Sequence, residues 1–298
     1  MNILSRRAPK GLPRQMIWLW GLLFIVAGAI GQAIISFKVL GLQGMDEAAV
    51  NEALGQSMGV DERATMMVLV WLLLQMVFAC AIPVYTFLMV DGFRRTSNFR
   101  NYALRVAGMA LLTEIPYNLC MYGKWFDFST RNPMIAMFLG LIMLFIFNYY
   151  GAKEFPNMKQ WLNKVANIAI CLLVFVMAFV WAYMLRIEHG MAIVLMFGVL
   201  WLLRKNRSYQ ILGGSAAMCI MAAFDGAMKG ISVYWLAPVA FLVVFFYNDD
   251  PEKIQYCGIY IGDGMFIAAR KTDYPVSEMP LNGNYYTERY KCARRFWE

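Results

Sequence analysis

The sequence has few charged residues and only one histidine. Asp, Glu, Lys and Arg make up 15% of its 298 residues, against about a quarter in a soluble domain. No GxGxxG, Walker-type or HExxH motif occurs, which removes several classes of soluble enzyme. The six cysteines show no CxxC or His/Cys spacing, so no metal site is expected.

Apolar residues are abundant instead. They make up 60% of the chain and give a mean hydropathy of +0.51, an excess that requires the lipid bilayer as a solvent. Eight apolar stretches approach the roughly 20 residues that a spanning helix needs. The sixth is short and would have to be buried among other helices. The stretches are Met16–Phe37, Ala64–Val90, Tyr102–Tyr122, Pro133–Tyr149, Val165–Leu185, Gly190–Leu203, Tyr209–Phe224 and Ser232–Tyr247.

The distribution of Lys and Arg among the loops predicts the orientation. If the N-terminus is cytoplasmic, the cytoplasmic segments hold more than twice as many basic residues as the outer ones, before the tail is counted. The positive-inside rule then favours eight spans with both termini in the cytoplasm. Because the net charge of +8 is distributed by membrane side, a nucleic-acid partner is not expected. The fold class predicted is all-α, a polytopic membrane helix bundle.

The bundle is expected to occupy residues 1–250. The acidic outer loop between the first two spans is expected to contain a short amphipathic helix. Residues 251–298 have no spanning run and are expected to form a small cytoplasmic appendage. A strand pair, Gln255–Ile261 and Met265–Arg270, is predicted there around a Gly-Asp-Gly turn.

Ionisable residues at membrane depth are the candidate site residues, because charge is costly there. Glu114 lies mid-span, and Pro116 is expected to break the helix beside it, which suits a proton acceptor or a ligand site. An ion pair to a neighbouring helix is the alternative. His189, next to Glu188, is either a general base or a solvated interfacial histidine. Asp225 ends the seventh span on the same outer side.

Asp91, at the inner end of the second span, is a further candidate catalytic residue, and an arginine-rich loop follows it. Guanidinium groups and aromatic rings suit a polyphosphate that carries a base, such as acyl-coenzyme A, although any positive-inside loop has this composition. The candidate coenzyme-binding residues are Arg94, Arg95, Thr96, Arg100, Tyr102 and Arg105. The mechanistic prediction is that these arginines and Glu114 face one polar chamber.

Several of these residues, in order and spacing, resemble the TraX family, whose named member is the F-pilin acetylase. The resemblance covers residues 82–148 and rests on the run 82–93, Thr96-Ser97-Asn98, Tyr102, Arg105, Glu114-Ile115-Pro116-Tyr117 and Asn132. It implies a multi-pass protein of the bacterial inner membrane that moves an acetyl group from acetyl-CoA to an amine of a membrane-associated peptide or pilin-like acceptor. The family's Asp-His motif is absent, because Gly28 and Ala29 stand there, so Glu114 or His189 would have to act as the base.

Two other functions stay open. The chain could be a catalytically degenerate member that acts as a membrane assembly or transport partner of another protein. A small-solute transporter is less favoured, because the spans show no repeat symmetry and hold few intramembrane charges.

Overall fold

The computed structural model describes residues 14–245, with gaps at 44, 46, 58–61, 97, 127–128, 152, 157–158 and 230, and residues 259–269 and 276–280. The described chain is mostly helical. It divides into two compact units, a helical unit within Gly11–Tyr247 and a second unit that includes Asn248–Glu298.

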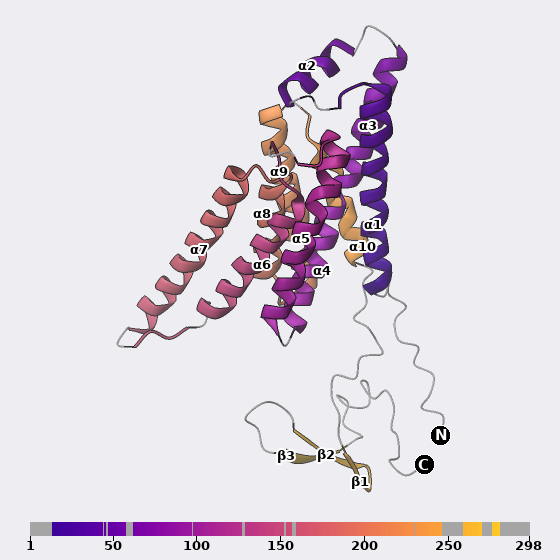
Figure 1. Ribbon diagram of the computed structural model, residues 1–298. Coiled ribbons are helices and arrows are strands. Elements are labelled where there is room, and N and C mark those ends of the chain that lie inside the picture. The colour runs from indigo at the N-terminus through magenta and orange to yellow at the C-terminus, as the bar shows by residue number, and fades with distance from the viewer. Residues whose placement is uncertain are drawn as a thin grey trace. The chain divides into compact units, whose positions relative to one another are not determined.

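The helical unit is built from α-helices with one π-helix and one 3₁₀-helix (Figure 1). In chain order these are α1 (Arg14–Ile30), the π-helix η1 (Gly31–Val39), α2 (Glu47–Ser57), α3 (Glu62–Ala79), α4 (Ala81–Arg95), α5 (Phe99–Tyr122), α6 (Pro133–Tyr150), α7 (Gln160–Met184), α8 (Gly190–Leu202), α9 (Arg207–Lys229), the 3₁₀-helix η2 (Val233–Ala240) and α10 (Phe241–Phe245). The short helix expected in the loop after the first span is α2.

Within the part of the chain that the structure describes, five helical segments are long and apolar enough to cross a membrane: 15–39, 62–95, 133–150, 160–184 and 207–228. They identify a helical protein of membrane type, but they do not amount to the eight spans expected. The helix α5 is long enough but carries Arg100, Arg105 and Glu114, which lower its hydropathy. The helix α8 has only 13 residues.

The predicted second span is interrupted at Cys80, between α3 and α4. Pro83 lies in the first turn of α4, where its ring removes an N–H donor and crowds the carbonyl of Ala79, four residues earlier. The Cys80 thiol donates to the carbonyl of Leu236, 3.4 Å away, which ties the interruption to η2. Beyond it, α4 is buried along most of its length.

By contrast, α5 runs unbroken through Pro116, so the expected helix break is wrong. The proline removes one N–H, which leaves only the carbonyl of Leu112 without its usual donor. Pro116 lies on an exposed face of α5, where its ring crowds no neighbouring helix. A helix within a membrane tolerates such a proline because the rest of its hydrogen-bond ladder is retained.

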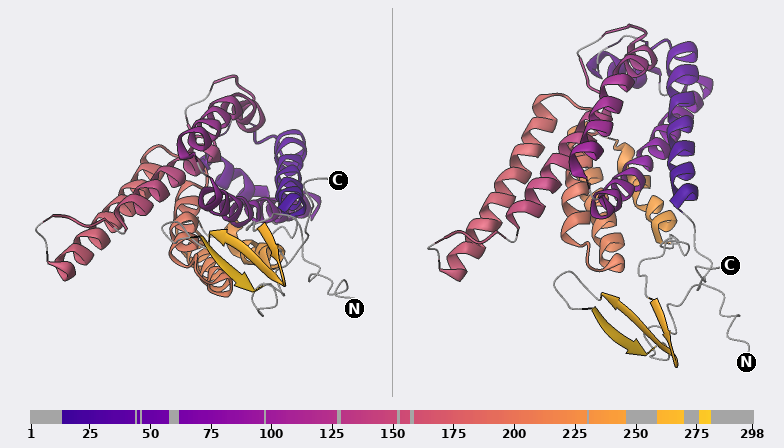
Figure 2. Two further views of the ribbon diagram at one scale, coloured as in Figure 1. Left: turned by 90° about the horizontal axis from the view of Figure 1, so that it is seen from below. Right: turned by 60° about the horizontal axis from the view of Figure 1, so that its bottom comes forward.

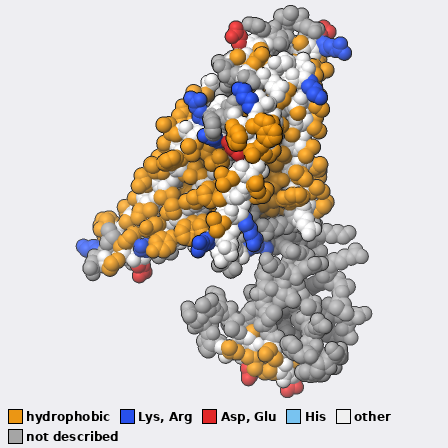
Figure 3. All heavy atoms as spheres, viewed as in Figure 1, with side chains coloured by type: hydrophobic (Ala, Val, Ile, Leu, Met, Phe, Trp, Pro, Cys, Tyr) orange, Lys and Arg blue, Asp and Glu red, His pale blue; other side chains and the backbone are white. Residues whose placement is uncertain are grey.

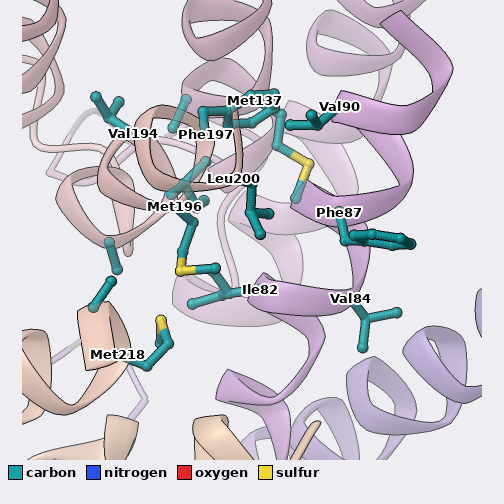
Figure 4. Close-up of a cluster of buried hydrophobic side chains, with 14 of the residues drawn as sticks. Ile82, Val84, Phe87, Val90, Met137, Val194, Met196, Phe197, Leu200 and Met218 are labelled. Atoms are coloured by element: carbon teal, nitrogen blue, oxygen red, sulfur yellow. The ribbon is translucent and has the colours of Figure 1, made fainter. Parts of the chain in front are cut away.

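The short helix α8 forms the centre of the unit and packs against α4, α6, α7 and α9. Most of its residues are buried, as expected for a helix too short to span alone, and Leu202 at its end is exposed. Figure 4 shows the cluster in which Val194, Met196, Phe197 and Leu200 of α8 meet side chains of α4, α6 and α9. The labelled partners are Ile82, Val84, Phe87, Val90, Met137 and Met218.

The outer helices expose apolar side chains. Leu111 and Leu112 of α5 are 77% and 71% exposed. The helix α7 lies at the edge of the unit and packs only its inner side against α6 and α8 (Figure 2). Hydrophobic side chains cover most of the face of the helical unit in Figure 3. Water would not tolerate so large an apolar surface, whereas lipid does.

The second unit contains an antiparallel sheet in the order β1 (Ile259–Gly262), β2 (Met265–Ala269), β3 (Val276–Pro280). A tight turn joins β1 to β2, and Asp263 and Gly264 both adopt positive φ, 47° and 74°, as a two-residue hairpin turn requires. The predicted strand pair is confirmed over residues 259–269, and its outer parts, 255–258 and 270, lie outside the described residues. The sheet corrects the all-α fold class.

Candidate functional site

Acidic and polar side chains gather at one end of the helical unit, which we call the acidic end. The chain turns there between α5 and α6, between α7 and α8, and between α9 and η2. The acidic cluster consists of Glu114, Arg131, Glu188, His189, Asp225 and Tyr234. The opposite end, where α4 and α8 finish and α9 begins, is called the arginine end.

Backbone pairing fixes the connection from α7 to α8 against the connection from α5 to α6. The N–H of Arg131 donates to the carbonyl of Arg186, 3.0 Å away, and the N–H of Glu188 donates to the carbonyl of Arg131, 2.9 Å away. Arg186 and His189 adopt left-handed backbone conformations, with φ of 50° and 55°. Positive φ is uncommon outside glycine, and these two residues make the tight turn that holds Glu188 in place.

His189 has a polar neighbour at each ring nitrogen, and only Nδ1 is within hydrogen-bond distance of its neighbour. Its Nδ1 lies 2.7 Å from the hydroxyl of Tyr234, and its Nε2 lies 3.9 Å from the carboxylate of Glu188. The ring of Phe78 packs 5.6 Å away, between centroids. With a neutral imidazole, the Tyr234 hydroxyl donates to Nδ1, and the Nε2–H faces Glu188. This arrangement can relay a proton between the two side chains.

Glu114 lies beside this group but has its own partners. One carboxylate oxygen is 3.7 Å from Nη1 of Arg131, and the other accepts from the N–H of Asn132 at 3.4 Å. Asn132 caps the start of α6 through its side chain and also donates to the carbonyl of Ala110. Glu114 therefore pairs with the start of the neighbouring helix, and Arg131 connects it to the backbone that positions Glu188.

Further side chains act on the cluster electrostatically. Asp225 of α9 and Glu188 both lie close enough to influence the hydroxyl of Tyr234. Glu188 also acts on the hydroxyl of Tyr117 in α5, which is hydrogen-bonded to Thr130 at 2.9 Å. The cluster thus contains the carboxylates of Glu114, Glu188 and Asp225 together with the guanidinium of Arg131, which pairs with Glu114.

Glu188 is more exposed than the two side chains that line up behind it. Its side chain is 24% exposed, whereas that of His189 is 13% exposed and Tyr234 is buried. A carboxylate with an imidazole behind it can accept a proton from a bound amine and pass it on. Such an arrangement is of the kind that general-base chemistry requires, with a carboxylate as the base and an imidazole as the relay.

Asp91 and the predicted coenzyme-binding residues lie at the arginine end. Asp91 forms an ion pair with Arg95, whose Nε lies 2.9 Å from it. The Tyr102 hydroxyl donates to the carbonyl of Met89 at 3.3 Å, and the Thr96 hydroxyl donates to that of Asn98 at 3.3 Å. The side chains of Arg94, Arg100 and Arg105 are exposed.

The shared chamber of Glu114 and the arginines is therefore not formed. Along α5, Glu114 is fifteen residues from Phe99, at the arginine end, and nine residues from Arg105, so about 22 Å and about 14 Å of helix separate it from these two residues. The structure brings Glu114, His189 and Asp225 to one end and places Asp91 at the other. The expectation failed because it relied on a helix break that does not exist.

The sequence also contains Gly55-Gln56-Ser57-Met58-Gly59, which has the GxSxG spacing of a hydrolase nucleophile. That motif acts on a turn from a strand into a helix. Here Ser57 is the last residue of the helix α2, and no strand precedes it among the described residues of the helical unit. The described residues also contain no group of three or more His, Cys, Asp or Glu side chains that could hold a metal ion.

Comparison with known protein families matches residues 242–295 to the NlpC/P60 family, a family of cell-wall peptidases. No curated protein and no solved structure matches the chain. This finding corrects the resemblance to the TraX family, because the family that matches is a different one. The matched segment has two cysteines, Cys257 and Cys292, but no histidine, so it cannot by itself assemble a thiol–imidazole pair.

Sequence reasoning did not identify Tyr234 and Arg131 as members of the cluster. Both follow turns on the side of the membrane where Glu188 and Asp225 were expected. The alternation of spans could therefore have placed them at the same end. Their pairing with His189 and Glu114 could not have been found, because it depends on which helices are neighbours.

Proposed function

We propose that this protein is a multi-pass membrane enzyme that transfers an acyl group to an amine at its acidic end. The proposal includes eight crossings in a bacterial inner membrane, with the arginine end and both termini on the cytoplasmic side. It is supported by the five apolar segments and by the arginines that end α4 and precede α9. The helices α5 and α8 and the η2–α10 segment would complete the crossings.

One observation carries the catalytic part: His189 lies between the Tyr234 hydroxyl, at 2.7 Å, and the Glu188 carboxylate, at 3.9 Å. A catalytic hydrogen bond is often long before substrate binds, so the longer distance suits a relay that tightens in the complex. Tyr234 orients the imidazole, and Glu188 presents the base to the substrate. The negative charge of the Glu188 carboxylate itself favours an ammonium group.

The reaction proposed uses a thioester donor, acetyl-CoA. Glu188 takes one proton from the substrate ammonium, and the neutral amine nitrogen then bonds to the acyl carbon. The carbon–sulfur bond breaks, and the coenzyme leaves as a thiol after taking the second amine proton. Because α8 is 13 residues long, the arginine end is about 20 Å away, so a donor with its phosphates there must be extended.

The experiment uses the full-length protein in nanodiscs with acetyl-CoA and a short hydrophobic peptide that has a free N-terminal amine. Mass spectrometry detects the acetylated peptide, and a thiol reagent measures free coenzyme. We expect transfer by the wild type and a loss of about 10²- to 10⁴-fold in Glu188→Gln, the usual range for removal of a general base.

Glu154→Gln is the matched control, because it removes an exposed carboxylate from the loop after α6, away from the acidic end. It should retain wild-type activity. If the wild type transfers nothing, or if both variants lose activity equally, the proposed mechanism is refuted.

A second candidate is a non-catalytic membrane partner in assembly or transport. It is favoured by the ion pair of Glu114 with Arg131, in which a predicted site residue links α5 to the start of α6, and by the pair of Asp91 with Arg95, which lies within α4. Saturating acetyl-CoA would then leave the thermal unfolding midpoint of the wild type unchanged, whereas the enzyme should be stabilised by its donor.

A further inference from the structure

The arginine end contains a fixed guanidinium group that takes no part in the proton transfers proposed for the acidic end. Arg204 follows α8 and folds back over Trp201, with its Cζ 4.1 Å from the ring centroid. Its Nη1 donates to the carbonyl of Trp201 at 2.9 Å. Stacking and the hydrogen bond together hold the guanidinium in one position.

A second arginine is brought to the same place by packing between α4 and α8. Trp201 meets Phe93 of α4 edge to face, at 5.4 Å between centroids. Arg94 follows Phe93 directly, and its side chain is exposed. Burial and the nearby charge of Arg94 lower the pKa of Arg204.

No carboxylate in the described part of the chain forms an ion pair with Arg94 or Arg204. The neighbouring Arg95 differs, because it is paired with Asp91. Two like charges without an acid between them are unfavourable unless an anion joins them. A guanidinium fork matches the oxygens of a phosphate, and a fixed fork binds with less loss of side-chain freedom.

We propose that Arg94 and Arg204 form a phosphate-binding site at the arginine end of the helical unit. The phosphate belongs either to the headgroup of an anionic phospholipid or to a soluble phosphorylated compound. The site does not depend on the proposed acyl transfer, because it lies at the opposite end of α8 from Glu188. The phosphate-binding site combines Arg94 with Arg204. Arg204 was not among the predicted coenzyme-binding residues, and Arg100 and Arg105, which were, are not part of this site.

The test measures thermal unfolding of the full-length protein in two arms. In the first, nanodiscs of phosphatidylglycerol are compared with nanodiscs of phosphatidylcholine. In the second, inorganic pyrophosphate is titrated in a neutral detergent. Stabilisation in the first arm alone identifies a lipid headgroup, and stabilisation in the second identifies a soluble phosphate compound; either result supports the site.

The variants are Arg204→Gln and Arg94→Gln, with Lys205→Gln as the control that removes an equal charge beside them. Each arginine variant should weaken the response at least about tenfold in ligand concentration, and the control should not. Arg204→Gln also removes a hydrogen bond to α8, whereas Arg94 is exposed, so Arg94→Gln tests binding without that loss. A response equal in Lys205→Gln and the arginine variants, or no response of the wild type in either arm, overturns the proposal.

Discussion

Gly140 of α6 faces the ring of Phe197 in α8 at the centre of the helical unit. A Cβ at position 140 would lie 2.5 Å from Cδ2, 2.7 Å from Cγ and 2.8 Å from Cε2 of that ring. Ordinary contact between carbon atoms is about 3.5 to 4.0 Å, so the added methyl group requires a shift of about 1 Å. Phe197 has no exposed surface and cannot yield without moving its neighbours.

We therefore expect Gly140→Ala to destabilise the helical unit through overpacking. Gly108→Ala in α5 is the matched control, because a Cβ there meets nothing within 4 Å. Both variants gain the helix propensity of alanine, so the difference between them isolates the clash, about 1 to 3 kcal/mol. Thermal unfolding in detergent, followed by circular dichroism, measures this difference.

A double variant tests the assigned cause. Phe197→Leu removes the ring edge that the methyl group meets, so it should cost less in the Gly140→Ala background than in the wild type. The reasoning is refuted if Gly140→Ala and Gly108→Ala unfold at the same temperature, or if the cost of Phe197→Leu is equal in both backgrounds.

Three other changes test the acidic end by thermal unfolding. Arg131→Gln should destabilise the protein by about 1 to 3 kcal/mol, because it leaves the buried carboxylate of Glu114 without its cation, and Glu114→Gln in the same chain should recover part of that loss. Tyr234→Phe should cost about 1 kcal/mol or more, since Nδ1 of His189 loses its partner; an unchanged midpoint would contradict that bond. Asn132→Ala should cost about 0.5 to 2 kcal/mol, because α6 loses its N-cap; no loss would show that the cap is replaced by water.

Composition and turn chemistry predicted the parts of the fold that depend on local sequence. The short stretch after His189 was expected to be buried, and α8 is buried because a 13-residue helix cannot span the bilayer alone. The Gly262-Asp263-Gly264 turn predicted a hairpin, because two successive positive φ angles suit Asp and Gly. These features need no knowledge of which helices are neighbours.

The two prolines within predicted spans show where local reasoning failed. Pro116 was expected to break its helix, yet α5 continues through it, whereas Pro83 accompanies an interruption that was not predicted. Each proline lacks the backbone N–H that other residues donate within a helix. They differ in surroundings: Pro83 is buried beside an interruption anchored to η2, and Pro116 is exposed. The consequence of a proline thus depends on tertiary packing, which the sequence does not reveal.

The candidate site was predictable only in part for the same reason. The alternation of spans placed Glu188, His189 and Asp225 on one side, and the structure places them at one end. The position of Glu114 was predicted wrongly. A helix break at Pro116 was expected to open a chamber between Glu114 and the arginine-rich loop, and no such break occurs. The strand β3, Val-Ser-Glu-Met-Pro, lacks alternating apolar residues and ends in proline, so its pattern does not distinguish an edge strand from a loop.

Because the acidic end and the arginine end are far apart, a last prediction concerns whether substitutions at one end affect the other. Glu188 and Arg204 lie at opposite ends of α8, about 20 Å apart, so the effects of substituting them on the free energy of unfolding should add within about 0.5 kcal/mol.

For transfer activity, the expected effect of substituting Arg204 depends on where the donor binds. If one extended acetyl-CoA touches both ends, Arg204→Gln should raise KM for the donor and leave kcat nearly unchanged, because phosphate contacts are the same in the ground state and the transition state. If the donor binds wholly at the acidic end, Arg204→Gln should leave both constants unchanged while the response to phosphatidylglycerol is lost. A fall in kcat alone would contradict both arrangements, since it would place Arg204 in the chemical step.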